Sequence, residues 1–226
     1  MAWLEGLSSM FIVCFAGIFG IIMAIKAKKM NARVLFYCGM MAIFVGLIWI
    51  GTMVDLWLMF FQIGHLQDRH VYCIMEYMWA FPAFVYAMII GAELMAPEKK
   101  KLILIVSIIL GVVFELFLFL GAREAFKTPE PPTGELYSSS FVLVHPVFIF
   151  IAIFIGTIFV FLVIGSLRMG LKSSGELRKK YYLLSLGFFL FIIVVFIDSF
   201  FDEPILPDII MICVAFLIYF ALRPKA

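Results

Sequence analysis

Apolar runs of about 20 residues recur along the whole chain, and they constrain the fold more than any motif does. An α-helix rises 1.5 Å per residue and needs about this length to cross ~30 Å of hydrocarbon. A β-barrel would instead require shorter segments that alternate in polarity, and none stands out. Of the 226 residues, 65% are hydrophobic and 14% are charged, which excludes an ordinary soluble domain. We therefore predict an all-α integral membrane protein.

Short polar segments separate seven apolar runs, each of which we predict to be a helix. We take the seven as one transmembrane domain over residues 1–226. We expect the first run to be a retained helix rather than a signal peptide, because no basic leader precedes it. The second is about 28 residues long, so it must tilt, protrude or extend along the membrane surface. The predicted helices lie near 8–25, 34–61, 71–95, 102–120, 141–167, 181–201 and 206–222.

Basic residues collect on alternate loops. The loops KAKKMNAR, PEKKK and RMGLKSSGELRKK and the final RPKA carry 14 of the 17 Lys and Arg residues, whereas the opposite loops and helix ends carry 12 of the 15 Asp and Glu residues. Cytoplasmic loops retain the excess of Lys and Arg. We therefore predict a seven-transmembrane bundle in the plasma membrane, with the N-terminus outside and the C-terminus cytoplasmic. The basic face should also attract anionic lipid head groups.

Ionisable side chains gather near the predicted outer ends of the helices. A charged group that faces lipid is costly, so these groups should point into the bundle, pair or carry a proton. Asp198 and Asp202 are four residues apart on one helix face, where like charges repel, and a cation, His145 or a loop arginine can compensate them. We predict an outward-facing acidic vestibule under the 121–140 loop that binds a cationic or amine ligand. Its predicted residues are Asp55, Glu76, Trp79, Glu115, His145, Asp198 and Asp202.

Several of these groups also have a purely structural interpretation. Glu76 and Glu115 can form internal hydrogen bonds or salt bridges instead of a ligand site, and Asp202 can be a solvated helix end. His145 precedes Pro146, whose ring leaves carbonyls of the preceding turn unpaired, so this histidine can complete a broken first helical turn.

Pro82 interrupts the third predicted helix and should kink it. Trp79 lies three residues before it, where it either shapes the floor of a pocket or packs between helices. Glycines at 39, 46 and 51, and the pair Ala152 and Gly156, are expected to permit close helix contacts. All four cysteines fall inside apolar runs, which favours buried thiols over disulfides or a zinc site.

The sequence lacks the groups that several known membrane chemistries require. A retinal Schiff base needs a lysine inside the membrane, yet every lysine lies in a loop or at a helix end. The three histidines do not form a helical HxxxH pair for zinc, although His65 and His70 leave a metal site with Glu76 open. No nucleophile elbow is present. We expect no enzymatic activity, no cofactor and no nucleic-acid partner.

Four segments resemble a family of seven-helix membrane proteins of archaea, particularly of the Asgard lineages. They are LFYCGMMAIFVGLIWIGTMVDLW, EYMWAFPAFVYAMIIGAELMAPEKK, FELFLFLG and LRKKYYLLSLGFFLFIIVVFIDSFFD. More distantly, the layout resembles the seven-helix sensor regions at the front of some histidine kinases, but without a kinase. The resemblance implies an N-out bundle in an archaeal plasma membrane. It implies no activity and no functional residues.

Three functional hypotheses remain open. In the first, a receptor-like or interaction protein binds an external ligand in the vestibule and signals to a cytoplasmic protein at 168–180; we expect no output domain after the last helix. In the second, a small transporter or ion-coupled carrier is built as a 3+1+3 arrangement of parallel repeats. In the third, a structural membrane subunit pairs its acidic residues internally and has no ligand. Because the polar groups are confined to the outer third, the receptor-like interpretation is favoured.

Overall fold

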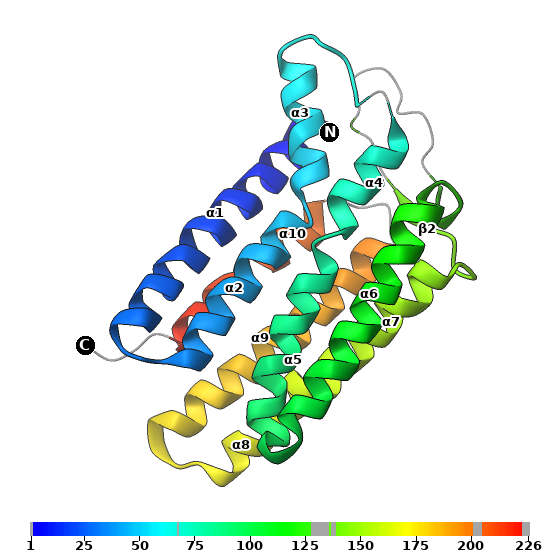
Figure 1. Cartoon of the computed structure of the whole chain (residues 1–226). Helices are drawn as coiled ribbons and strands as arrows, with labels where there is room; N and C mark the ends of the chain where they lie inside the picture. The colour runs from blue at the N-terminus through cyan, green and yellow to red at the C-terminus, as the bar shows by residue number, and fades with distance from the viewer. Residues whose placement is uncertain (1, 67, 128–135, 137–138, 201–204, 223–226) are drawn as a thin grey trace.

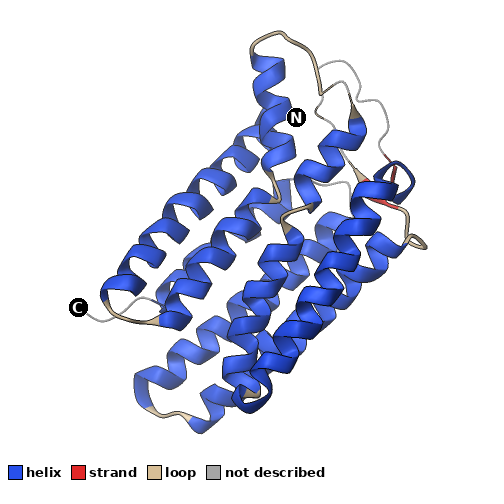
Figure 2. Ribbon diagram, viewed as in Figure 1, coloured by secondary structure: helices blue, strands red, loops and turns tan. Residues whose placement is uncertain are grey.

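The computed structural model describes residues 2–66, 68–127, 136, 139–200 and 205–222. Almost all of these residues belong to helices that pack side by side in one elongated bundle (Figures 1 and 2), so the all-α prediction is confirmed. The helices are α1 (Ala2–Lys29), α2 (Arg33–Leu47), α3 (Ile50–Phe60), α4 (Arg69–Tyr77), α5 (Ala80–Met95), η1 (Pro97–Lys99), α6 (Lys100–Ala125), α7 (Pro146–Ile158), the π-helical η2 (Phe159–Ile164), α8 (Gly165–Lys172), α9 (Gly175–Phe200) and α10 (Ile205–Leu222).

Five of the described helical segments are long and apolar enough to cross a membrane, and a sixth is counted if α2 and α3 form one span. The five are Trp3–Lys29, His70–Met95, Pro97–Ala125, Pro146–Lys172 and Gly175–Ile197. Large apolar side chains cover the outside of the bundle, with Leu120 85% exposed and Leu102 61% exposed. An apolar exterior of this kind identifies a membrane protein, because lipid tails can solvate it.

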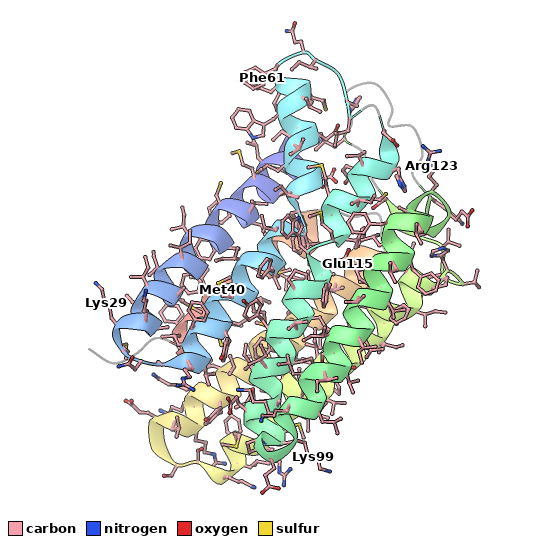
Figure 3. The ribbon with its side chains drawn as sticks, in the orientation of Figure 1. Lys29, Met40, Phe61, Lys99, Glu115 and Arg123 are labelled. Atoms are coloured by element: carbon pink, nitrogen blue, oxygen red, sulfur yellow. The ribbon has the colours of Figure 1, made fainter. Side chains whose placement is uncertain are left out.

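The two ends of the bundle differ in charge. Lys29 and Lys99 lie at one end, which we call the basic end, and Phe61 and Arg123 lie at the other (Figure 3). The opposite end carries the carboxylates Asp68 and Glu124, with Asp55 on α3 and Glu76 on α4, and we call it the acidic end. Glu115 lies further toward the middle of the bundle (Figure 3).

The predicted helix over 34–61 is in fact two helices. The axes of α2 and α3 meet at 46°, and no proline causes the bend. Instead, the Ile48 and Trp49 N–H groups donate to the carbonyls of Val45 and Gly46, three residues back, which tightens the last turn of α2. The bend lets a long apolar run change direction rather than tilt as a single rod.

A second break lies in the neighbouring segment, between α4 and α5. Pro82 has no N–H for the Met78 carbonyl, and its ring clashes with that carbonyl. The helix accordingly stops at Tyr77 and resumes at Ala80, so the predicted interruption is confirmed. Because α2 packs on α5 and α3 packs on α4, the two breaks lie side by side in the bundle (Figure 1).

The segment before α7 differs from the prediction. The sequence predicts a helix from residue 141, but the helix begins at Pro146. Residues Ser140–Phe141 (β2) instead pair antiparallel with Phe126–Lys127 (β1). This short ladder closes the acidic end of α6 against the start of α7.

Glycines allow the closest approach of α1 and α2. A Cβ atom on Gly20 would lie 2.5 Å from the Gly39 carbonyl oxygen, and one on Gly39 would lie 2.7 Å from the Gly20 carbonyl oxygen. The predicted contact role of Gly156 is wrong, since a Cβ there would meet nothing within 4 Å. Ala152 and Gly156 both lie on the exposed face of α7.

Candidate functional site

A buried hydrogen-bonded cluster joins α3, α4 and the segment before β2. The Thr52 hydroxyl donates to Glu76 Oε1 at 2.9 Å and lies 3.1 Å from the Tyr72 hydroxyl. Ser139 Oγ donates to the other carboxyl oxygen, Glu76 Oε2, at 3.3 Å. Glu76 is 8% exposed and Tyr72 is 2% exposed. The cluster therefore supplies Glu76 with protein partners where water has little access.

Gly51 makes room for this cluster. A Cβ atom on Gly51 would lie 2.6 Å from Glu76 Cγ and 3.2 Å from the Tyr72 carbonyl oxygen. Only glycine allows α3 and α4 to approach closely enough for Thr52 to reach the carboxyl group. The glycine and the threonine thus act together in placing Glu76 between the two helices.

Asp55 lies one turn further along α3 and is completely buried. Its Oδ2 lies 3.1 Å from His65 Nδ1, and its Oδ1 accepts a hydrogen bond from the Leu66 N–H at 3.0 Å. Both partners come from the segment between α3 and α4. Asp55 therefore ties that segment back onto its own helix, and this carboxylate is largely occupied by the protein itself.

Glu115 and Trp79 differ from Glu76 and Asp55 in their hydrogen bonding. Glu115 Oε2 and Trp79 Nε1 are both buried, and neither has a hydrogen-bond partner among the described residues. Trp79 lies in the break between α4 and α5, and its ring stacks on Phe44 of α2 with centroids 6.1 Å apart. Buried polar atoms are nearly always paired in native proteins, so the Glu115 carboxyl group can accept, and the Trp79 indole can donate, a hydrogen bond with an added group.

His145 caps α7. Its Nδ1 accepts a hydrogen bond from the Val147 N–H at 3.3 Å, and its ring packs against Gly121 of α6. This is the arrangement expected for a histidine that completes a proline-interrupted first turn. The structure thus gives His145 a capping contact, and its described contacts include none of the predicted vestibule acids.

The remaining charges near this end have other roles. Arg123 lies 3.9 Å from Asp68 at the surface, and Asp68 Oδ1 also accepts a hydrogen bond from the His70 N–H at the start of α4. In the part of the chain that the structure describes, no three His, Cys, Asp or Glu side chains are grouped closely enough to hold a metal ion. Asp198 belongs to α9, but its side chain and the whole of Asp202 lie outside the described residues.

Aromatic rings fill the interface between α2 and α5 on the basic side of the breaks. The Phe44 ring stacks on Tyr86 at 5.7 Å, and Tyr86 contacts Tyr37 at 6.2 Å. Lys100 Nζ lies 5.6 Å from the centre of the Tyr37 ring and also pairs with Glu93. We call this series, from Phe44 to Lys100, the aromatic column. It packs the α2–α5 interface from the breaks to the basic end.

Sequence reasoning missed Thr52, His65 and Ser139 as members of the site. Thr52 is the polar residue three positions before Asp55 within an apolar run, which is a usable signal for a residue on the same helix face. Ser139 had no such signal, because its place beside Glu76 depends on the path of the chain between α6 and α7. His65 was considered as a metal ligand, whereas it contacts Asp55.

No protein-family model matches this chain, and no curated protein matches it. The resemblance to seven-helix archaeal membrane proteins therefore stays a prediction from the sequence.

Proposed function

We propose that the chain is a receptor-like or interaction protein of the plasma membrane. It crosses the bilayer seven times, with α2 and α3 as one bent span and α10 as the last. The acidic end faces outward with the N-terminus, and the basic end and the C-terminus are cytoplasmic. The charge difference between the two ends supports this orientation, because cytoplasmic loops retain lysine and arginine.

The observation that carries the proposal is the way external segments are bonded to α3 and α4. His65 and Leu66 contact Asp55, and Ser139 contacts Glu76. Both carboxylates belong to helices on the acidic side of the paired breaks. An event at the outer surface is thereby connected to two half-helices that can pivot at their breaks, which is a hinge-type route for a signal.

The ligand of the receptor is proposed to be a cation or an organic amine. Asp55 and Glu76 already have internal partners, so the carboxyl oxygen of Glu115 is the acceptor best suited to an added ammonium group, with Trp79 beside the break. Asp198 and Asp202 complete the proposed site from the sequence. Ligand binding would shift the acidic-side half-helices, and the basic segment 168–180 would present the change to a cytoplasmic protein.

A thermal-stability screen tests this proposal. The detergent-purified protein is melted with chelator, calcium, zinc, sodium or a panel of organic amines. A ligand that binds only the folded state raises the melting temperature in proportion to the logarithm of its concentration. We expect one amine or cation to do so, and Glu115→Gln or Asp198→Asn to abolish the rise. Glu124→Gln, on the exposed end of α6, is the matched control and should retain it.

Cysteine labelling tests the orientation independently. In a background in which the exposed native thiols Cys14 and Cys213 are replaced by serine, a cysteine at Ile63 should react with an impermeant reagent in intact cells. A cysteine at Lys29 should react only after the membrane is opened. The reverse pattern would overturn the proposed orientation.

A transporter is the second candidate, and the paired helix breaks favour it. Discontinuous helices form the substrate sites of many transporters, near the middle of the membrane. Against it, the aromatic column occupies the α2–α5 interface toward the basic end, where a conduit between these helices would have to pass. Uptake of the identified ligand into proteoliposomes, abolished by Glu115→Gln, would establish the transporter in place of the receptor. If no additive raises the melting temperature and no uptake is measured, the structural subunit would be favoured.

A further inference from the structure

A π-helical segment, η2, lies between α7 and α8. π-Helical turns hold one more residue per turn than α-helical turns, are rare and occur mostly as single turns at functional sites. η2 directly precedes α8 and the basic segment 168–180, which carries five exposed or half-exposed Lys and Arg side chains. The turn therefore sets the rotational position of the segment that the proposed function assigns to output.

A serine of α9 holds the π turn. Ser185 Oγ donates a buried hydrogen bond to the Val163 carbonyl oxygen at 2.9 Å. In a regular α-helix that carbonyl would accept from the N–H four residues ahead. The side chain of a neighbouring helix here supplies a donor to the π turn, and this bond exists only while η2 and α9 are in contact.

The same arrangement leaves a second serine without a partner. Ser166 is completely buried, and its Oγ has no hydrogen-bond partner among the described residues. A serine inside an α-helix normally donates to the carbonyl four residues back, which would be Leu162. That carbonyl accepts the Gly165 N–H, and Ser166 Oγ makes no bond to it. The π form is thus stabilised by the hydrogen bond from Ser185 and destabilised by the buried Ser166 hydroxyl, which has no partner among the described residues.

Two glycines let α8 dock in this register. A Cβ on Gly165 would lie 2.9 Å from Met95 Cγ at the end of α5, and one on Gly170 would lie 2.8 Å from the Tyr182 ring of α9. On the other side, α5 touches the π turn directly, since a Cβ on Gly91 would lie 2.5 Å from Phe161 Cβ. Displacement of α5 therefore acts on η2 through Phe161.

We propose that η2 is a register switch that couples movement of α5 to the position of α8. Conversion of the π turn to α-helix advances α8 by about one residue, a rotation of roughly 100°. Met169 then takes the place of Gly170 against Tyr182, where there is no room for a side chain. α8 must consequently lift from α9, and Ser166 moves toward the surface. The docked form is the π form, and the released form is α-helical.

The switch rests on the proposed function for its biological role, but its existence does not depend on a ligand. The switch predicts that two serine-to-alanine substitutions shift the balance between the docked and released forms in opposite directions. Ser185→Ala removes the bond that holds the π form and favours release. Ser166→Ala removes the unpaired hydroxyl of the docked form and favours docking.

Hydrogen exchange in lipid nanodiscs measures the balance, because a released α8 has lost its packing on α9 and opens locally more often, and local opening sets the exchange rate even when the open form is rare. Relative to the parent, Ser185→Ala should lower the protection of residues 160–170 roughly fivefold or more, the equivalent of one net hydrogen bond. Ser166→Ala should raise it. Ser107→Ala is the control, since this buried α6 serine bonds to its own Ile103 carbonyl, and it should leave 160–170 unchanged.

Shifts in the same direction for both variants, or no shift in either, would overturn the switch. A loss of protection that extends equally to α6 in Ser185→Ala would indicate general destabilisation, and Ser166→Ala then decides alone. If no additive raises the melting temperature but Ser185→Ala and Ser166→Ala change protection in opposite directions, the receptor proposal fails and the switch stands. If a ligand binds and these opposite changes are absent, the switch fails and the receptor stands.

Discussion

Replacing Thr52 by valine tests whether the buried cluster holds α3 and α4 together. Valine keeps the shape of the side chain and removes the hydroxyl that donates to Glu76 at 2.9 Å and lies 3.1 Å from the Tyr72 hydroxyl. Glu76 and Tyr72 are 8% and 2% exposed, so water has little access to replace the lost donor. Removing one hydrogen-bond donor from a buried carboxyl group costs about 1–3 kcal/mol, and we expect the free energy of unfolding to fall by that amount.

Reversible unfolding in mixed micelles with increasing SDS, followed by far-ultraviolet circular dichroism, measures this loss. Thr52→Ser retains the hydroxyl and should recover most of it. Thr157→Val is the matched control, because its hydroxyl bonds only to the Ile153 carbonyl of its own helix at the bundle surface, and the change should be within about 0.5 kcal/mol of the parent.

A double-mutant cycle isolates the pair. Thr52→Val removes the donor and Glu76→Leu removes the acceptor of one contact, so their effects should fall short of additivity by about 0.5–3 kcal/mol. Additive effects, or a Thr52→Val protein as stable as the parent, would refute the conclusion that this hydrogen bond joins the two half-helices.

Other contacts make equally direct predictions. His65→Ala should destabilise the protein by about 1–3 kcal/mol in the same unfolding assay, because it removes a partner of a fully buried carboxylate. His70→Ala should cost less, because the His70 Nδ1 atom has no hydrogen-bond partner among the residues that the structure describes. Gly20→Ala should be strongly destabilising, since the added Cβ would lie 2.5 Å from a backbone oxygen of α2. Gly156→Ala should be neutral or slightly stabilising, because it meets open space and favours helix by about 1 kcal/mol. Equal effects at the two glycines would contradict the packing described for α1 and α2.

The positions of the helices follow from local signals, which is why most of the predicted ranges overlap the observed helices. Apolar length and Pro82 are properties of adjacent residues, and both act within one or two turns. The bend between α2 and α3 has no such signal, because it depends on backbone turns at Ile48 and Trp49 rather than on proline or glycine at the break. The strand pairing at 140–141 likewise depends on a partner outside its own segment, Phe126–Lys127 at the end of α6.

The candidate site likewise has features that can be predicted from local sequence and features that cannot. That Asp55, Glu76 and Glu115 belong to the acidic half of the bundle follows from their places within the apolar runs. Their separate roles cannot be predicted from those places. Asp55 and Glu76 have hydrogen-bond partners because Thr52, His65 and Ser139 lie beside them. These partners reach the acids through tertiary packing and loop geometry, neither of which leaves a periodic trace in the sequence. The sequence therefore predicts a cluster of acids but not the hydrogen bonds within it.

The indole N–H of Trp79 has no hydrogen-bond partner in the described part of the chain, and this ring makes the protein its own optical reporter. Indole emission moves to longer wavelength when water reaches the ring and its N–H gains a hydrogen-bond acceptor. Trp3 and Trp57 are 52% and 44% exposed on the bundle surface, whereas Trp79 lies between helices, stacked on Phe44. With the other tryptophans replaced by phenylalanine, the emission of this single ring would follow wetting of the helix break in real time. Movement at the centre of the bundle can thus be observed without any attached dye.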